Sequence, residues 1–168
     1  MNKSAYWQSR KELKYYQEVL RFARQYAPGG GSVLDVGSHN CDYITWFDWF
    51  ANRHKIDLRK TIEIEGVKTM QGDFMQFQSP ITYDLVLCLQ VLEHLREPAA
   101  FAQKLLSTGK ILIVSVPYRW NAGKCPCHPQ DPVDEEKLLQ WFKISWSEMT
   151  IVTDGKVRRL VAVYRHQG

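Results

Sequence analysis

The stretch SVLDVGSHNCDY, residues 32–43, decides the fold because it joins a strand to a turn. Residues 32–36 form a short apolar run typical of a buried strand, and Gly37 follows it directly. A turn that binds the phosphates of a dinucleotide needs further glycines, so that the backbone can approach the ligand. His39 and Cys41 stand there instead. The stretch therefore predicts a strand followed by a turn that offers no cradle for a pyrophosphate.

Strands and helices alternate along the rest of the chain. Four further apolar runs predict strands at residues 55–58, 67–70, 83–89 and 110–116, and two more, 149–153 and 157–164, flank the hairpin signal Asp154-Gly155. Helical spacing predicts helices over residues 9–26, 43–51, 98–106 and 134–142. Too few residues separate the second and third strands for a full helical crossover. The order predicts an α/β fold: a doubly wound, mostly parallel seven-stranded sheet with a C-terminal antiparallel hairpin and an abbreviated second crossover.

Length and composition are typical of one folded domain. With 168 residues, 45% of them hydrophobic and 24% charged, the chain has little room for a second core, so residues 1–168 are expected to form a single domain. The absence of a long apolar run and of a visible secretory signal predicts a cytoplasmic protein without a membrane partner. A formal net charge of +4, spread among acidic residues, does not indicate a nucleic-acid partner.

Acidic residues stand at the ends of the first three expected strands. They are Asp35 before the turn glycine, Asp57 at the end of the second strand, and Asp73 after the third. In open α/β sheets the ligand binds outside the carboxyl ends of the strands, where strand order reverses. The spacing of 22 positions between residues 35 and 57 fits that from a first turn to a ribose-binding carboxylate. These residues predict an adenosine-type ligand that carries no pyrophosphate.

With these motifs the chain resembles the class I S-adenosylmethionine (SAM)-dependent methyltransferases of the small-molecule type. The matching stretches are VLDVGS (33–38), GDF (72–74), YDLVLCLQVLEHL (83–95) and ILIVSVPY (111–118). The resemblance covers roughly residues 30–165, and the third stretch is its most specific part. It implies a Rossmann-like methyltransferase fold whose last strand is reversed. It also implies SAM as the cofactor and S-adenosylhomocysteine (SAH) as the product.

The resemblance further implies which strand ends hold each part of the cofactor. Asp57 would hold the ribose hydroxyls, Asp73 the adenine amine, and Leu89 or Gln90 the methionine amino group. Asp35 and Gly37 would flank the methionine moiety. The full set expected to bind the cofactor is Asp35, Gly37, Ser38, His39, Asp57, Leu58, Asp73, Phe74, Leu89 and Gln90.

Two histidines are candidates for a base that takes a proton from the acceptor. His94 follows the fourth strand, and His128 lies in loop 119–132 after the fifth. Each can be neutral near pH 7, and the sequence does not choose between them. His94 fits the first turn of a helix equally well. The N-terminal segment 1–28 and loop 119–132 are expected to close the acceptor side, and the candidates for acceptor binding are Tyr118, Arg119, Trp120 and Asp131.

The four cysteines are too few and too irregularly spaced for a disulfide framework, so all are expected to be free thiols. Cys125, Cys127 and His128 look like part of a metal site. A closed zinc site needs four ligands, however, and the sequence has no second cluster nearby. No metal site is therefore expected.

The activity favoured by the sequence is transfer of the sulfonium methyl group of SAM to an oxygen or nitrogen of a small-molecule acceptor. The protein would contribute alignment, exclusion of water and a base. The alternative is a non-catalytic, methyltransferase-like binding or regulatory module, because His39 and Cys41 replace glycines and Gln90 stands where an acid is common. A dinucleotide-dependent oxidoreductase is disfavoured by the missing glycines.

Overall fold

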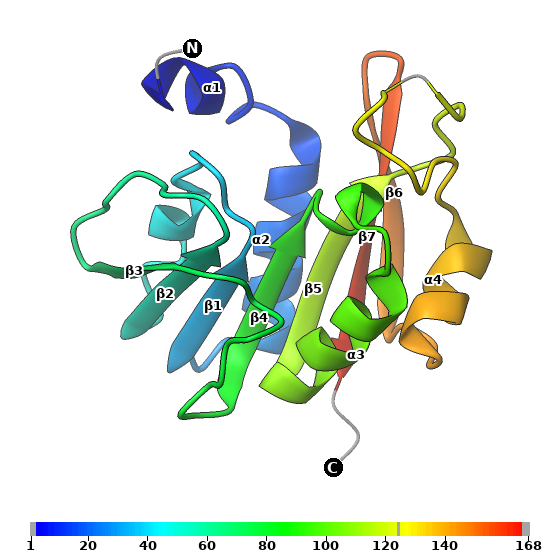
Figure 1. Ribbon diagram of the computed structural model, residues 1–168. Coiled ribbons are helices and arrows are strands. Elements are labelled where there is room, and N and C mark those ends of the chain that lie inside the picture. The colour runs from blue at the N-terminus through cyan, green and yellow to red at the C-terminus, as the bar shows by residue number, and fades with distance from the viewer. Residues whose placement is uncertain (1–2, 124, 166–168) are drawn as a thin grey trace.

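The computed structural model describes residues 3–123 and 125–165 and is built on a seven-stranded sheet with the order β3-β2-β1-β4-β5-β7-β6 (Figure 1). The strands are β1 (Ser32–Val36), β2 (Asn52–Asp57), β3 (Val67–Gln71), β4 (Tyr83–Leu89), β5 (Gly109–Pro117), β6 (Glu148–Asp154) and β7 (Val157–Arg165). Strands β1 to β5 pair in parallel, and β7 runs antiparallel to both of its neighbours. The predicted mostly parallel sheet with its C-terminal hairpin is confirmed.

Helices cover both faces of this sheet. They are α1 (Lys3–Gln8), α2 (Lys14–Tyr26), α3 (Pro98–Thr108) and α4 (Glu135–Phe142), with two single 3-10 turns, η1 (Tyr43–Trp46) and η2 (Leu92–His94). Helix α2 lies behind the sheet in Figure 1, and α3 and α4 lie in front. Within the described part of the chain, no helix has both the length and the apolar character needed to cross a bilayer.

Two apolar clusters hold these layers together, one on each face. Phe22 of α2 packs in the cluster that contains Leu85 of β4, whereas Leu105 of α3 belongs to the cluster that contains Val86. Leu85 and Val86 are adjacent, and both are fully buried, because successive side chains of a strand point to opposite faces. This double cover explains why β4 is apolar almost throughout.

The segment after β1 contains less helix than the sequence predicts. The prediction of a helix over residues 43–51 is wrong, since only the turn η1 forms there. A short helix is costly to nucleate, and aromatic and β-branched side chains lose rotamer freedom in it. Phe47 and Phe50 are nevertheless buried, as the apolar spacing suggests.

The N-terminal helix is also shorter than predicted, because residues 9–13 form a turn between α1 and α2. The backbone N–H groups of Arg10 and Lys11 both donate to the carbonyl of Trp7 and so close α1. The region from β2 to β3 contains no helix, which confirms the abbreviated second crossover. Asp134 caps α4 by accepting from the N–H of Lys137 (3.1 Å), as its position predicts.

The cysteines fall into two pairs. Cys41 and Cys88 are free and buried, whereas Cys125 and Cys127 are joined by a disulfide. The prediction of free thiols is therefore wrong for Cys125 and Cys127. The number and spacing of cysteines do not show how a loop bends. This loop places the Cα atoms of Cys125 and Cys127 5.3 Å apart, a separation that a disulfide spans.

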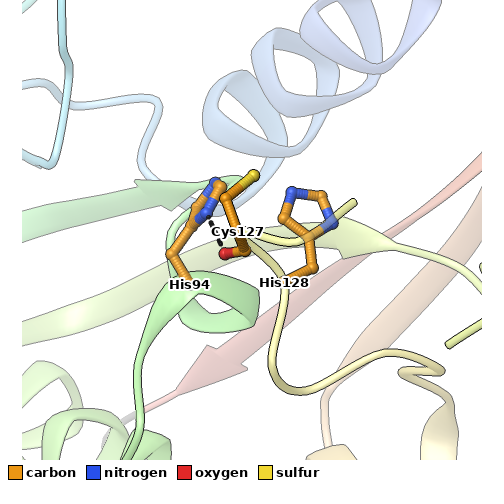
Figure 2. Close-up of side chains that lie close together, drawn as sticks. All are labelled: His94, Cys127 and His128. Atoms are coloured by element: carbon orange, nitrogen blue, oxygen red, sulfur yellow. Dashed lines mark hydrogen bonds between the residues drawn. The ribbon is translucent and has the colours of Figure 1, made fainter. Parts of the chain in front are cut away.

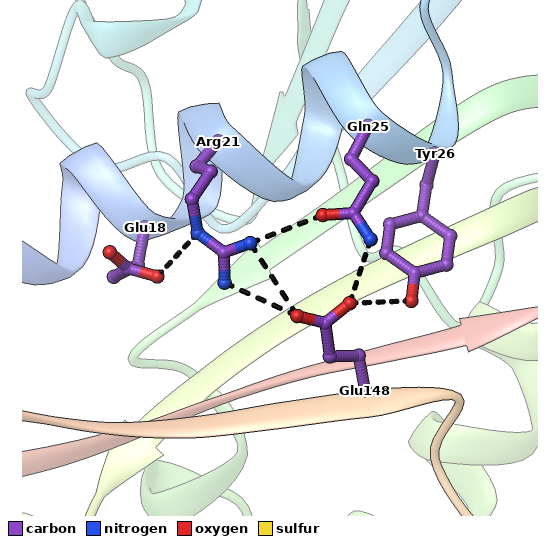
Figure 3. Close-up of polar contacts among 5 residues, drawn as sticks. All are labelled: Glu18, Arg21, Gln25, Tyr26 and Glu148. Atoms are coloured by element: carbon purple, nitrogen blue, oxygen red, sulfur yellow. Dashed lines mark hydrogen bonds and ion pairs between the residues drawn. The ribbon is translucent and has the colours of Figure 1, made fainter.

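Helix α2 is bound to strand β6 at both of its ends. Near its C-terminus, Glu148 accepts hydrogen bonds from side chains of α2 (Figure 3), including that of Tyr26 at 2.8 Å. At its N-terminus, the N–H of Lys14 donates to Asp154 Oδ1 (3.0 Å). The other oxygen of Asp154 pairs with the buried Arg159 at 3.3 Å. The two ends of α2 are therefore held by the two ends of β6.

Replacing Asp154 with alanine is expected to lower the free energy of unfolding by about 2–4 kcal/mol, because Arg159 stays buried without its carboxylate and Lys14 loses its acceptor. The matched control is Asp48→Ala. Asp48 pairs with Arg24 at 3.8 Å, and both side chains are more than half exposed, so its loss should change the free energy by less than about 0.5 kcal/mol. Urea unfolding of both variants checks this, and equal losses would contradict an anchoring role for Asp154.

Candidate functional site

A cavity of about 490 Å³ lies at the carboxyl ends of the parallel strands, within the size range of small-molecule sites. Strands β1 to β4 contribute Gly37, Asp57, Asp73 and Gln90 to its wall from their carboxyl ends. Strands β1 and β4 are neighbours in the sheet, and the chain proceeds from them in opposite directions. The cavity therefore lies where strand order reverses, the usual ligand position in this architecture.

Most of the residues predicted to bind the cofactor meet at this cavity. All of them line it except Asp35, and so does His94. The N-terminal segment closes another part of the wall with side chains that the sequence did not single out as ligand contacts: Tyr6, Arg10, Tyr15 and Tyr16. The remaining predicted residues are not among those that line it, namely His128, Tyr118, Arg119, Trp120 and Asp131.

The turn after β1 depends on Gly37. Its φ is +80°, and a Cβ at this position would lie only 2.5 Å from Val91 Cγ2, just beyond β4. The turn continues through His39, whose backbone N–H donates to Asp57 Oδ2 at 2.9 Å. The N–H of Arg59 donates to Oδ1 of the same carboxylate, also at 2.9 Å. Asp57 is thus fixed at the cavity wall, and each of its oxygens keeps a lone pair for a ligand.

The two residues that replace glycines contact the N-terminal segment. The ring of His39 stacks on that of Tyr6 with 4.9 Å between centroids. Cys41 Sγ lies 3.6 Å from the hydroxyl of Tyr16, which is buried. Glycines would make neither contact. The unusual side chains of this turn therefore help to hold the N-terminal segment over the cavity.

Asp35 lies behind the cavity wall and is fully buried. Tyr43 donates its hydroxyl hydrogen bond to Oδ1, and Oδ2 has no hydrogen-bond partner among the described residues. Burial raises the pKa of Asp35 to about 7, although the Tyr43 hydroxyl and the charge of Lys55 oppose this shift. The structure thus separates Asp35 from the residues that face the cavity, and its contacts give it a supporting position beneath the turn.

Gln90 is held on two sides at the end of β4. Its Oε1 accepts from Arg159 Nε (3.2 Å), and its Nε2 donates to Ser115 Oγ (3.2 Å). The guanidinium of Arg159 lies 5.0 Å from the ring centroid of Tyr15, so it also packs against the N-terminal segment. An amide suits position 90 because it both accepts and donates, which a carboxylate cannot do. Arg159 was not singled out from the sequence; the signal that could have found it is a charged residue directly before the apolar run 160–164.

The two candidate bases belong to one cluster. The rings of His94 and His128 are nearly perpendicular, with centroids 4.5 Å apart. His94 Nδ1 lies 2.8 Å from the carbonyl oxygen of Cys127 (Figure 2), and His128 Nδ1 lies 3.1 Å from a carboxylate oxygen of the buried Asp131. Burial lowers the pKa of His94, which favours the neutral form of its imidazole. His94 and Cys127 line the cavity, whereas His128 is not among the residues that line it.

The side chains after β5 bind other parts of the protein. Tyr118 donates its hydroxyl hydrogen bond to Glu135 (2.9 Å), and Arg119 forms an ion pair with the same carboxylate (3.5 Å). The indole N–H of Trp120 donates to the carbonyl of Arg158 (3.1 Å). These contacts fasten the start of the loop to α4 and β7. Among the described residues of the loop, Cys127 is the one that lines the cavity.

The sequence and the fold were compared with those of known proteins. No protein-family profile and no curated protein matches the sequence. Among solved structures, N-methyltransferase NodS from Bradyrhizobium japonicum, in complex with SAH, matches with a TM-score of 0.70 and 14% identity over 92% of this chain and 87% of that chain. A methyltransferase from Clostridium acetobutylicum matches with a TM-score of 0.68 and 9% identity over 92% of both chains. This chain has the class I methyltransferase fold.

A third solved structure carries a second ligand beside SAH. It is the 1,6-didemethyltoxoflavin-N1-methyltransferase from Burkholderia thailandensis, with bound 1,6-didemethyltoxoflavin and SAH. Its TM-score is 0.72 and its identity 12%, over 94% of this chain and 80% of that chain. The methyltransferase fold that the sequence motifs predict is confirmed by these likenesses.

Gly37→Ala is expected to lower the free energy of unfolding of this methyltransferase fold for two reasons. An alanine in the left-handed backbone conformation costs about 1 kcal/mol. The overlap of its Cβ with Val91 costs roughly a further 1–3 kcal/mol. Gly155→Ala is the matched control: Gly155 has a φ of +61°, but nothing lies within 4 Å of an added Cβ. It should show the backbone cost alone. Thermal and urea unfolding measure both, and similar losses would show that the close approach to Val91 is unimportant.

Asp35 is expected to make the stability of the methyltransferase fold depend on pH. In the folded protein its pKa of about 7 lies above the value in the unfolded chain. Its contribution to the free energy of unfolding is therefore most favourable below about pH 4 and declines as the pH rises through 7. Between pH 5 and 8 the decline should be about 2–3 kcal/mol. Asp35→Asn should remove it, whereas the exposed control Asp48→Asn should not. Urea unfolding across this range gives the slopes, and an unchanged slope in Asp35→Asn would refute the assignment.

Proposed function

We propose that the chain binds SAM in this cavity and transfers its methyl group to an oxygen or nitrogen of a small-molecule acceptor. The observation that carries the proposal is the convergence of four strand ends on one cavity of a methyltransferase fold. NodS and the toxoflavin methyltransferase, which share this fold, are both described with SAH bound. Both are named as N-methyltransferases, and the second holds the small molecule 1,6-didemethyltoxoflavin beside SAH, which supports a small-molecule acceptor here.

The residues present fit the nucleoside part of this cofactor. Asp57 offers two oxygens that are already oriented by backbone N–H groups, an arrangement suited to the two ribose hydroxyls. Asp73 is held in the same way, because its Oδ1 accepts from the N–H of Met75 at 2.8 Å. Its carboxylate is the proposed acceptor for the adenine amine, and Phe74 lies beside it on the wall.

The residues at the methionine end also fit. The lack of a Cβ at Gly37 lets a ligand approach the backbone, and Leu89 and Gln90 supply acceptors for an amino group. Arg10 lines the cavity, and its guanidinium donates to the hydroxyl of Tyr15 at 3.5 Å. A guanidinium in a cavity wall can bind a carboxylate through charge-assisted hydrogen bonds. We assign Arg10 to the carboxylate of the methionine moiety.

Bound SAM would supply a methyl group that is already activated by its sulfonium. The chain then has to orient the acceptor, exclude water and take a proton. The rings of Tyr6 and Tyr16 cover the cavity on the side of the N-terminal segment. His94 is the base that this geometry favours, because it lines the cavity and its Nδ1 is bonded to a carbonyl. That bond fixes the proton on Nδ1 and leaves Nε2 free to accept one.

Calorimetric titration with SAH tests the cofactor assignment. The wild-type protein is expected to bind SAH with a dissociation constant on the order of micromolar. Asp57→Ala should weaken binding by about 100-fold, because it removes both ribose acceptors. Asp48→Ala, which removes an exposed carboxylate away from the cavity, should bind as the wild type does.

Other outcomes of this titration have definite meanings. A folded wild-type protein that binds no SAH would contradict the proposal and favour the non-catalytic binding module. Binding of a nicotinamide dinucleotide in place of SAH would overturn the interpretation of the turn after β1.

A further inference from the structure

Three side chains with metal-binding atoms meet beside the cavity. They are His94 of η2 and Cys127 and His128 of the loop after β5, and their ligating atoms all lie within 4.8 Å of one another (Figure 2). His94 and Cys127 are 33 residues apart in the chain, so spacing along the sequence does not reveal the cluster. The fold thus brings His94 next to the adjacent residues Cys127 and His128.

Both histidines are oriented as metal ligands usually are. Metal-binding imidazoles bond through their other ring nitrogen to a backbone carbonyl or a carboxylate, which fixes the tautomer and the ring. His94 Nδ1 has the carbonyl of Cys127 at 2.8 Å, and His128 Nδ1 has the carboxylate of Asp131 at 3.1 Å. The side chain of Asp131 is fully buried, so this partner is held firmly. In each ring Nε2 remains as the ligand atom.

We propose that the reduced protein binds one divalent ion of the zinc class through His94, Cys127 and His128. Two imidazoles and a thiolate favour zinc over magnesium or calcium, which prefer oxygen ligands. Three protein ligands leave a fourth position open, as in catalytic zinc sites. Because His94 and Cys127 line the cavity, the ion borders the space assigned to the acceptor.

Metal binding and the disulfide exclude each other. In the structure Cys127 is bonded to Cys125, and a disulfide sulfur is not a thiolate ligand. A dithiol reductant breaks this S–S bond by giving two electrons and two protons, so that both cysteines become thiols and the dithiol becomes a disulfide. Cys127 then releases its proton to water when it binds the ion. The site is therefore available only to the reduced protein.

The consequence for catalysis rests on the proposed function, whereas metal binding itself does not. In the loaded protein Nε2 of His94 holds the ion and cannot serve as a base. A bound ion would supply Lewis-acid chemistry, which would lower the pKa of an acceptor hydroxyl that approaches it and let the proton pass to water. With the Cys125–Cys127 disulfide formed, His94 would take the acceptor proton. With the disulfide reduced, the bound ion would promote loss of that proton to water.

Titration with Co²⁺, a spectroscopic substitute for zinc, tests the site in the full chain. The protein is reduced under nitrogen with a water-soluble phosphine, which takes up an oxygen from water as it becomes the phosphine oxide. One equivalent of Co²⁺ is expected to bind, with a thiolate-to-cobalt charge-transfer band and the intense visible absorption of four-coordinate cobalt. The oxidised protein should bind at least about 100-fold more weakly and show no such band. A reduced protein without the band would overturn the proposal.

Two cysteine variants in the same loop provide the matched comparison. Cys127→Ser removes a ligand and should lose the charge-transfer band, with binding at least about 10-fold weaker. Cys125→Ser removes only the disulfide partner, and it should bind as the reduced wild type does even without reductant. His128→Ala should weaken binding at least about 10-fold. Equal binding by the two serine variants would refute the assignment of Cys127.

The same samples separate this proposal from the cofactor assignment. SAH titration of metal-free Cys125→Ser reports the cofactor site alone, and Co²⁺ titration without SAH reports the metal site alone. Cobalt binding without SAH binding would leave the metal site standing and contradict the proposed function. The reverse result would retain the function and refute the metal site.

Discussion

The close approach of Gly37 to Val91 is the constraint on which the cavity depends. A Cβ at position 37 would overlap Val91, so only glycine lets the end of β1 lie against the segment that follows β4. The turn can then bring His39 to Asp57 and fix the carboxylate on the wall. A bulkier residue would separate the two strand ends between which strand order reverses. The positions of the polar groups around the cavity follow from that one contact between backbone and side chain.

A buried arginine connects this wall to the rest of the molecule. Arg159 donates to Gln90 at the cavity, pairs with Asp154 at the hairpin, and packs over Tyr15 of the N-terminal segment. A buried charge is unfavourable unless its partners are well placed, so these contacts constrain one another. The reversed strand β7 therefore does more than complete the sheet. It carries the group that positions the end of β4 relative to the helix behind it.

The strands were the most predictable part of the fold. β1 and β4 have the predicted bounds, because each is an apolar run that ends at turn residues and is covered on both faces. Residues 43–51 were mispredicted because buried aromatic side chains at helical spacing pack equally well on a single turn. The strand-end residues of the candidate site were also predictable. Asp35 was the exception, since sequence does not show whether a side chain at a strand end faces the cavity or the interior.

Features that depend on two distant segments were not predictable. The cluster of His94 with Cys127 requires the loops after β4 and β5 to meet, and the contact of His39 with Tyr6 requires α1 to fold over the turn. Neither juxtaposition leaves a periodic or spaced pattern in the chain. The Cys125–Cys127 bond was missed for a different reason, since it depends on how a short loop bends.

The attachment of α2 to β6 at both ends fixes one part of the cavity's cover and leaves the other part to α1. With Lys14 held by Asp154 and Tyr26 held by Glu148, α2 cannot tilt without breaking contacts at one end or the other. The cover of the cavity that lies before these anchors is α1, a helix of 6 residues joined to α2 through residues 9–13. Residues 9–13 therefore join a short helix that covers the cavity to a longer helix that is fixed at both ends, and Arg10 within them also lines the cavity.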